Sequence, residues 1–130
     1  MTDKALGRAA EIARLNDHLR RSFEGGRVVI TSGIAALDPL HINLILAGVR
    51  TFNAFAADND PYGEHDCATL MVRGVRVMWK IDYYDPTMTY LSSDPADPSV
   101  TVRVLTIMLA DEFCGVRACE MLIQTNRDSD

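Results

Sequence analysis

The chain has 130 residues, of which 48% are hydrophobic and 24% are charged, and its formal net charge is −5. The length fits one domain over residues 1–130, and the composition is that of a globular protein rather than a disordered or fibrous one. An acidic chain is also a poor candidate for direct nucleic-acid binding, because phosphate contacts require a surplus of Lys and Arg.

The charge is distributed unevenly along the chain. Residues 1–50 carry seven basic and five acidic side chains, a balance of +2, whereas residues 51–130 carry six basic and thirteen acidic ones, a balance of −7. The three cysteines are an odd number without paired spacing, and the chain has neither a signal-peptide pattern nor an apolar run of about 20 residues. We therefore expect a cytoplasmic protein that does not contact a membrane.

Residues 4–23 show the pattern of an amphipathic helix, because apolar side chains recur at spacings of three and four residues. These side chains are Ile12, Leu15, Leu19 and Phe23. Gly25 and Gly26 favour a helix end, and the β-branched residues that follow predict a short strand over 27–31.

A second helix is predicted to begin at Asp38, its N-cap, with Pro39 in the first turn, and to run to about Ala56. Its buried face would consist of Ile42, Ile45, Val49 and Phe52. His41 lies in the first turn, where we expect a partly exposed polar residue.

Residues 67–84 predict a β-hairpin. Apolar and polar residues alternate over 75–84, which is typical of a half-buried strand, and 67–72 alternate in the same phase. Arg73 and Gly74 would form the two-residue turn between them. The resulting register pairs Val72 with Val75, Leu70 with Val77 and Ala68 with Trp79, which places Trp79 in the core.

The remaining elements follow weaker patterns. Residues 88–91 are compatible with a short third strand, and Asp97 with Pro98 predicts a helix that ends near Phe113, although the sequence VTVRV within it also suits a strand. Together the elements predict an α+β fold, with a small, mostly antiparallel sheet around the central hairpin and about three helices on one face. The core would span residues 4–113, and residues 114–130 are weakly patterned.

Residues 58–66 form the densest group of candidate ligands. Read as a calcium loop that begins at Asp58, the segment has Tyr62 at position five and Thr69 at position twelve, where calcium loops carry oxygen ligands and a bidentate Glu. An EF-hand is therefore not expected. The chain also lacks a glycine-rich phosphate loop and a nucleophile elbow, so we expect no cofactor.

His65 is the candidate for chemistry within this segment. If the hairpin ladder continues beyond its first pair, His65 lies opposite Asp82, with Lys80 and Tyr84 beside it and Asp85 past the strand end. The pair of His65 and Asp82 suits a general base with its orienting carboxylate, or a cross-strand contact that fixes register. A metal-dependent site would use His65, Asp82 and Asp85, completed by Glu64, Asp58 or Asp60.

We expect the protein to be a non-enzymatic protein-binding module with an acidic surface, because acidic surfaces can bind the basic groove of a nucleic-acid-binding partner. The candidate surface comprises Asp58, Asp60, Tyr62, Glu64, His65, Asp66, Lys80, Asp82, Tyr84 and Asp85. Direct DNA binding through the first helix ranks last, because its arginines form no dense patch. These are Arg8, Arg14, Arg20 and Arg21.

Four segments in order resemble one protein family: Gly25–Leu37, Asp58–Asp66, Trp79–Asp85 and Asp94–Phe113. This family is the bacterial domain of unknown function 3768, whose members are small, mostly alphaproteobacterial and often plasmid-borne. The resemblance runs from about Ile12 to Phe113 and implies a mobile-element accessory role, with no catalytic assignment. It does not extend to the residues after Phe113, which include Cys114 and Cys119.

Overall fold

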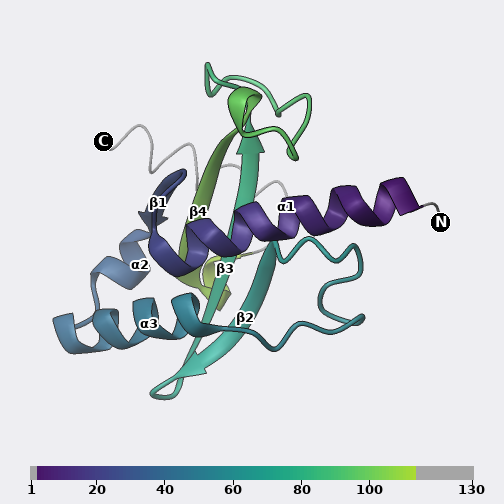
Figure 1. Ribbon diagram of the computed structural model, residues 1–130. Coiled ribbons are helices and arrows are strands. Elements are labelled where there is room, and N and C mark those ends of the chain that lie inside the picture. Colours follow the sequence, from purple (N-terminus) through teal and green to yellow (C-terminus); the bar gives the residue numbers. More distant parts are fainter. Residues whose placement is uncertain (1–2, 114–130) are drawn as a thin grey trace.

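The computed structural model describes residues 3–113 (Figure 1). The helices are α1 (Asp3–Ser22), α2 (Ser32–Ala35) and α3 (Pro39–Thr51), and the strands are β1 (Arg27–Ile30), β2 (Cys67–Val72), β3 (Val75–Tyr84) and β4 (Val102–Leu109). Two 3₁₀ turns, Pro98–Val100 and Ala110–Glu112, flank β4. No helix in this part of the chain is long and apolar enough to span a bilayer.

The four strands form one sheet in the order β1-β4-β3-β2. β3 pairs antiparallel with both β2 and β4, whereas β1 runs parallel to β4. The predicted α+β fold with a mostly antiparallel sheet is therefore confirmed. The hairpin register is also as predicted, from Val72 opposite Val75 to Ala68 opposite Trp79.

The hairpin turn has the backbone that a two-residue loop requires. Arg73 and Gly74 both have positive φ, 49° and 80°. Two consecutive residues with positive φ define a turn whose twist matches that of the strands it joins. The turn thus sets the register locally, and the alternating apolar residues then face the core.

The helices α1 and α3 lie across one face of the sheet (Figure 1). The core fills the space between this face and the helices, and Trp79 at its centre is fully buried, as predicted. Its other buried members are Leu19, Ile34, Ile45, Val49, Ala68, Val77, Ile81, Leu105 and Ile107. His41 is also buried, and its Nε2 lies 2.9 Å from the Val72 carbonyl, so it ties α3 to β2 instead of being partly exposed as expected.

The second helix is shorter than predicted, because α3 ends at Thr51 and not near Ala56. Phe52 has an extended backbone, which directs the chain into the loop that precedes β2. Phe52 and Phe55 then pack edge-on against Trp79, with ring centroids 6.0 and 6.1 Å away. Burial of the two rings favours leaving the helical path.

The predicted helix over 97–113 is wrong. Asp97 and Pro98 begin only one 3₁₀ turn, and residues 102–109 form β4. β4 lies between β1 and β3 and is buried on both faces, so its residues show no alternation of buried and exposed positions, and even the polar residues Arg103 and Thr106 are buried. Residues 88–91 contribute an isolated bridge, between Leu91 and Tyr84, rather than a strand. The expectations for residues 114–130 lie outside the described residues.

Candidate functional site

His65 precedes β2, at the end of the sheet where the ladder between β2 and β3 stops. The Ile81 N–H still donates to the Asp66 carbonyl at 2.7 Å, but His65 has a φ of +54° and leaves the strand path. Its imidazole stacks on Phe55 with a centroid distance of 3.9 Å and an interplanar angle of 2°. Because Phe55 packs against Trp79, the imidazole is on the helix-covered face of the sheet.

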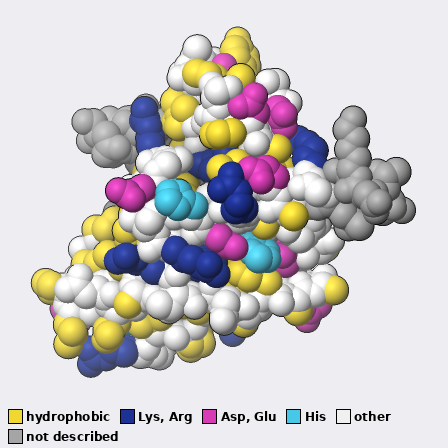
Figure 2. Space-filling model, viewed as in Figure 1, with side chains coloured by type: hydrophobic (Ala, Val, Ile, Leu, Met, Phe, Trp, Pro, Cys, Tyr) yellow, Lys and Arg dark blue, Asp and Glu magenta, His cyan; other side chains and the backbone are white. Residues whose placement is uncertain are grey.

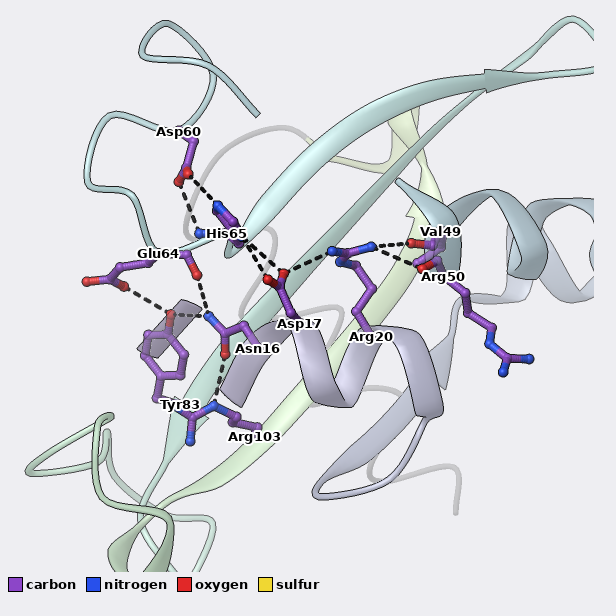
Figure 3. A network of polar contacts seen from close by, with 10 residues as sticks. All are labelled: Asn16, Asp17, Arg20, Val49, Arg50, Asp60, Glu64, His65, Tyr83 and Arg103. Atoms are coloured by element: carbon purple, nitrogen blue, oxygen red, sulfur yellow. Dashed lines mark hydrogen bonds and ion pairs between the residues drawn. The ribbon is translucent and has the colours of Figure 1, made fainter. Parts of the chain in front are cut away.

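The imidazole of His65 is held between two carboxylates (Figure 3). Its Nδ1 lies 3.0 and 3.1 Å from the two carboxylate oxygens of Asp17 in α1. A carboxylate only accepts, so Nδ1 carries the proton and donates it. Nε2 lies 3.6 Å from Asp60 Oδ2, and the other Asp60 oxygen accepts the His65 backbone N–H at 3.1 Å. The His65 side chain retains 30% exposure.

Arg20 connects the Asp17 carboxylate to α3. Its guanidinium, which is fully buried, donates to Asp17 Oδ1 at 2.9 Å and to the carbonyls of Val49 at 3.0 Å and Arg50 at 3.3 Å. Burial lowers the pKa of Arg20, and the hydrogen bond to Asp17 opposes this effect. The guanidinium therefore satisfies carbonyls at the C-terminal end of α3 while neutralising Asp17.

A second branch of the network joins α1 to the sheet. Asn16 is fully buried, and its Nδ2 donates to the Glu64 carbonyl and to Tyr83 Oη, both at 2.9 Å. Tyr83 donates to Glu64 Oε1 at 3.0 Å, and Arg103 Nε donates to Asn16 Oδ1 at 2.9 Å. Burial raises the pKa of Tyr83, so its hydroxyl remains a donor. Both branches hold residues 60–65 against α1.

The predicted pair of His65 and Asp82 is not formed. Asp82 forms an ion pair with Lys80, which is 8% exposed, on the face of the sheet opposite Trp79 and Ile81. His65 is on the helix-covered face, because its positive φ turns it out of the ladder that would have placed it beside Asp82. His65, the predicted general base, does contact a carboxylate, but this carboxylate belongs to Asp17.

Asp60 and Glu64, two of the other predicted site residues, belong to this network, whereas Asp85 makes its hydrogen bonds elsewhere. The Asp85 carboxylate accepts from Thr87 Oγ1 and from the backbone N–H groups of Thr89 and Tyr90, and the Tyr90 contact contributes most to lowering the pKa of Asp85. Asp58 is exposed, and Tyr84, the last residue of β3, is half-buried. Within residues 3–113, no three or more His, Cys, Asp and Glu side chains are grouped so as to hold a metal ion.

Sequence reasoning missed Asn16, Asp17 and Arg20. One signal was present, because Asn16 lies four residues after Ile12 and three before Leu19, within the apolar stripe of α1. A polar residue in such a stripe requires a buried hydrogen-bond partner. Nothing in the sequence indicated that this partner would come from residues 64 and 83, which are far along the chain.

The arginines of α1 are mostly occupied. Arg8 pairs with Asp94 at 3.2 Å, Arg14 with Glu11 at 2.5 Å, and Arg20 with Asp17. These contacts account for three of the four arginines in the helix. They further reduce the case for phosphate binding by α1, because each of these guanidinium groups already has a carboxylate partner.

Comparison with known proteins gives a family match. Residues 30–112 match a family described as "Protein of unknown function (DUF3768)". No curated protein and no solved structure matches the chain. The matched region includes the last residue of β1 and all of β2, β3 and β4. It also includes Asp60, Glu64 and His65. The α1 residues of the network, Asn16, Asp17 and Arg20, precede it. Because the match covers more than half of the chain, the protein belongs to the DUF3768 family of unknown function.

Proposed function

We propose that this protein is a non-enzymatic, cytoplasmic protein-binding module whose binding surface is formed by two loops, residues 52–66 and 85–101. One observation carries the proposal: large hydrophobic side chains in these loops are left in solvent. Tyr62 is 79% exposed, Tyr90 72% and Leu91 73%. Exposed aromatic side chains of this kind act as anchors at protein interfaces, where Tyr is enriched among the residues that dominate binding energy.

The charge of the two loops indicates the kind of partner. They contain seven acidic residues and no Lys or Arg. The loops leave the sheet where β2 begins and β3 ends, whereas Arg73 and Arg76 lie at the opposite end, around the hairpin turn. Figure 2 shows acidic side chains near the top of the view, where Figure 1 places residues 85–101. Such a surface favours a partner with a basic surface.

Not all of these acids are available to a partner. Asp60 and Asp85 are hydrogen-bonded within the protein, and Asp60 is 9% exposed. Asp58 is exposed and lies in the same loop as Tyr62. We therefore assign the anchoring role to the exposed aromatic and aliphatic side chains and the orienting role to the acids, which steer a basic partner toward the surface. The partner we propose is a nucleic-acid-handling protein of the host or of a plasmid, and we propose that the protein itself is encoded on a mobile element.

The test compares three baits in bacterial lysate, followed by titration with the purified partner. The baits are the wild-type protein, the variant Tyr62→Ser/Tyr90→Ser/Leu91→Ser, and the control Met71→Ser, which alters a side chain of β2 that is 61% exposed. We expect wild type and control to retain the same saturable partner and the triple variant to lose at least tenfold in affinity. Equal binding by all three baits would contradict the proposal, as would a lack of saturable binding.

A second candidate function, acid–base catalysis, is favoured by the contact between Asp17 and His65. Donation from Nδ1 to Asp17 fixes the imidazole tautomer and leaves Nε2 to accept or release a proton. A screen of chromogenic ester and phosphodiester substrates would test this function. Turnover that His65→Gln abolishes and Met71→Ser leaves unchanged would support catalysis, whereas turnover unaffected by His65→Gln would count against it.

A further inference from the structure

The sheet has a second face, opposite the one that carries the core. Successive side chains of a strand point to opposite faces, and Leu105 and Ile107 of β4 lie in the core. The residues that alternate with them, Val104, Thr106 and Met108, therefore point to the second face. They are 1%, 0% and 0% exposed, although none of them belongs to the core. Another part of the molecule must bury this stripe of β4.

Two methionines on the second face show how far the cover extends. Met71 of β2 points to this face, because its neighbours Leu70 and Val72 pack against the core, and it is 61% exposed. Met108 is 0% exposed, although a side chain of this length stands clear of the sheet. The Oγ1 atom of Thr106 is also buried and has no hydrogen-bond partner among the described residues. The cover therefore excludes water along β4 and leaves β2 open.

The described helices do not supply this cover. Each of the three contributes a buried residue to the core and so lies on the core face (Figure 1): Leu19, Ile34 and Ile45. Residues 52–66 pack on the same face, since Phe55 contacts Trp79. The loop over 85–101 lies at the far end of β4, where Val102 is six residues, or roughly 20 Å, from Met108.

The turn that follows β4 is too short to cover the stripe. It consists of the three residues Ala110–Glu112, or roughly 6 Å of 3₁₀ helix. The stripe from Met108 back to Val104 is four residues long, or roughly 13 Å of strand. Glu112 also directs the turn toward β1, because its carboxylate accepts from Thr31 Oγ1 at 2.6 Å. Residues 3–113 therefore leave the cover of β4 unexplained.

We propose that residues 114–130 fold back along β4 and cover the second face of the sheet, with the apolar side chains of residues 116–123 packed on the stripe. The start of this segment is close to the stripe, because Phe113 is only four residues past the end of β4 at Leu109. Its 17 residues span about 26 Å even as a helix, and more when extended. The segment is therefore long enough to pass every position from Met108 to Val104.

The composition of the segment also fits an apolar stripe. It is weakly patterned as a whole, but six of the eight residues 116–123 are hydrophobic. The two that are not, Arg117 and Glu120, are followed by Gln124, at spacings of three and four residues. In a helix these three polar side chains share one side, which leaves an apolar side to meet Val104 and Met108.

The cover is separate from the features discussed above. The family match ends at Glu112, so the proposed cover comes from outside the matched region. The stripe on β4 contains none of the exposed residues that carry the proposed function, which are Tyr62, Tyr90 and Leu91. Either proposal can therefore fail while the other stands.

Methyl NMR on the full chain tests the contact directly. With labelled Met, Leu and Ile methyl groups, we expect nuclear Overhauser effects between Met108 and Leu122 or Ile123 at every protein concentration. A mixture of labelled and unlabelled protein separates contacts within one chain from contacts between two chains. Contacts that form only between two chains would overturn the proposal in favour of a second copy. A Met108 methyl group without contact to residues 116–123 would also overturn it.

Methionine oxidation tests the cover by substitution. Oxidation by hydrogen peroxide depends on access to the sulfur, so in wild type we expect Met71 to react about tenfold faster than Met108. Leu122→Glu places a charge in the apolar run and should raise the rate at Met108 roughly fivefold, with the rate at Met71 unchanged. Gln124→Glu adds the same charge on the polar side and is the matched control, which should react as wild type does.

The emission of Trp79, which is buried on the core face, shows whether Leu122→Glu leaves the core folded. If it does not, Leu122→Ala and Gln124→Ala replace the two variants, with the same expectation at Met108. With the core folded, unchanged oxidation of Met108 in the variant of Leu122 would overturn the proposal. Equal rates at Met71 and Met108 in wild type would also overturn it.

Discussion

The two long helices, α1 and α3, cover the same face of the sheet but differ in where they carry polar and apolar side chains. On the inward side of α1, Asn16 and Arg20 are fully buried polar residues, and its outward side carries arginines. In α3 the inward residues Ile45 and Val49 are apolar, and so are the exposed residues Leu40 and Leu44. The buried side of α1 therefore contains polar residues, and the exposed side of α3 contains apolar residues.

The difference shows what each helix is used for. The polar groups of α1 bind residues 60–65 and the end of α3, which makes α1 the connector of loop, sheet and second helix. Buried polar groups stabilise a fold only when every partner is present, so α1 is sensitive to the loss of a single group. Apart from the hydrogen bond between His41 and the Val72 carbonyl, α3 packs against the sheet through apolar side chains such as Ile45 and Val49.

The largest effect is expected at Arg20. Arg20→Met keeps most of the side-chain volume but leaves Asp17 and the Val49 carbonyl without their guanidinium partner. Breaking a buried ion pair in this way should lower the free energy of unfolding by about 3–5 kcal/mol. Urea denaturation measures the change. Arg21→Met, at the exposed neighbouring position, is the control and should change stability by less than about 0.5 kcal/mol. Equal effects would mean that α1 is not the connector described here.

The next effect separates the two faces of α3. Ile45→Ala should cost about 3 kcal/mol, because Ile45 is fully buried and its truncation leaves a cavity. Leu44→Ala should cost less than about 0.5 kcal/mol, since Leu44 is 40% exposed. Both are measured by urea denaturation. A large loss from Leu44→Ala would show that this side chain packs against the rest of the protein.

A smaller effect is expected at Asp17. Asp17→Asn keeps the shape of the side chain but removes the charge that accepts from both His65 and Arg20. Hydrogen bonds to charged groups contribute about 1.5–3 kcal/mol, and Asn retains part of this, so we expect a loss of about 2 kcal/mol. Chemical denaturation gives the value, and protease cleavage within residues 52–66 should accelerate. Unchanged cleavage would contradict the role of Asp17 in holding this loop.

The smallest expected effect is a change in the pH dependence of the melting temperature. Burial raises the pKa of Asp66, and the charges of Glu64, Asp60 and Asp82 add to this. The folded protein thus retains a proton that the unfolded chain has already released, so the contribution of Asp66 to stability falls as pH rises from about 4 through the native pKa. Asp66→Asn should therefore melt at a higher temperature than wild type at pH 7, and the difference should vanish below about pH 4.

Asp97 provides a control of opposite sign. Its hydrogen bonds with Ser99 lower the pKa of Asp97, so its contribution to stability is present at neutral pH and is lost as pH falls through the native pKa. Asp97→Asn should consequently melt no higher than wild type at pH 7. A higher melting temperature for both variants would point to a general effect of net charge instead of the burial of Asp66.

The sequence by itself determined the elements whose signals are local. The hairpin over 67–84 follows from alternation and a two-residue turn, and α1 follows from its spacing of apolar residues, because in both cases the chain within a few residues specifies the geometry. The start of α3 follows from Asp38 and Pro39 for the same reason. These elements were sufficient to predict the α+β class.

Only the tertiary structure decided the features that depend on residues distant in sequence. β4 is a strand because β1 and β3 pair with it on both sides, although its pattern also resembles a helix. His65 contacts Asp17 and not Asp82, because a positive φ ends the ladder and α1, 48 residues earlier in the chain, lies across that end of the sheet. Side-chain partners are chosen by packing in three dimensions, and no local pattern carries that information.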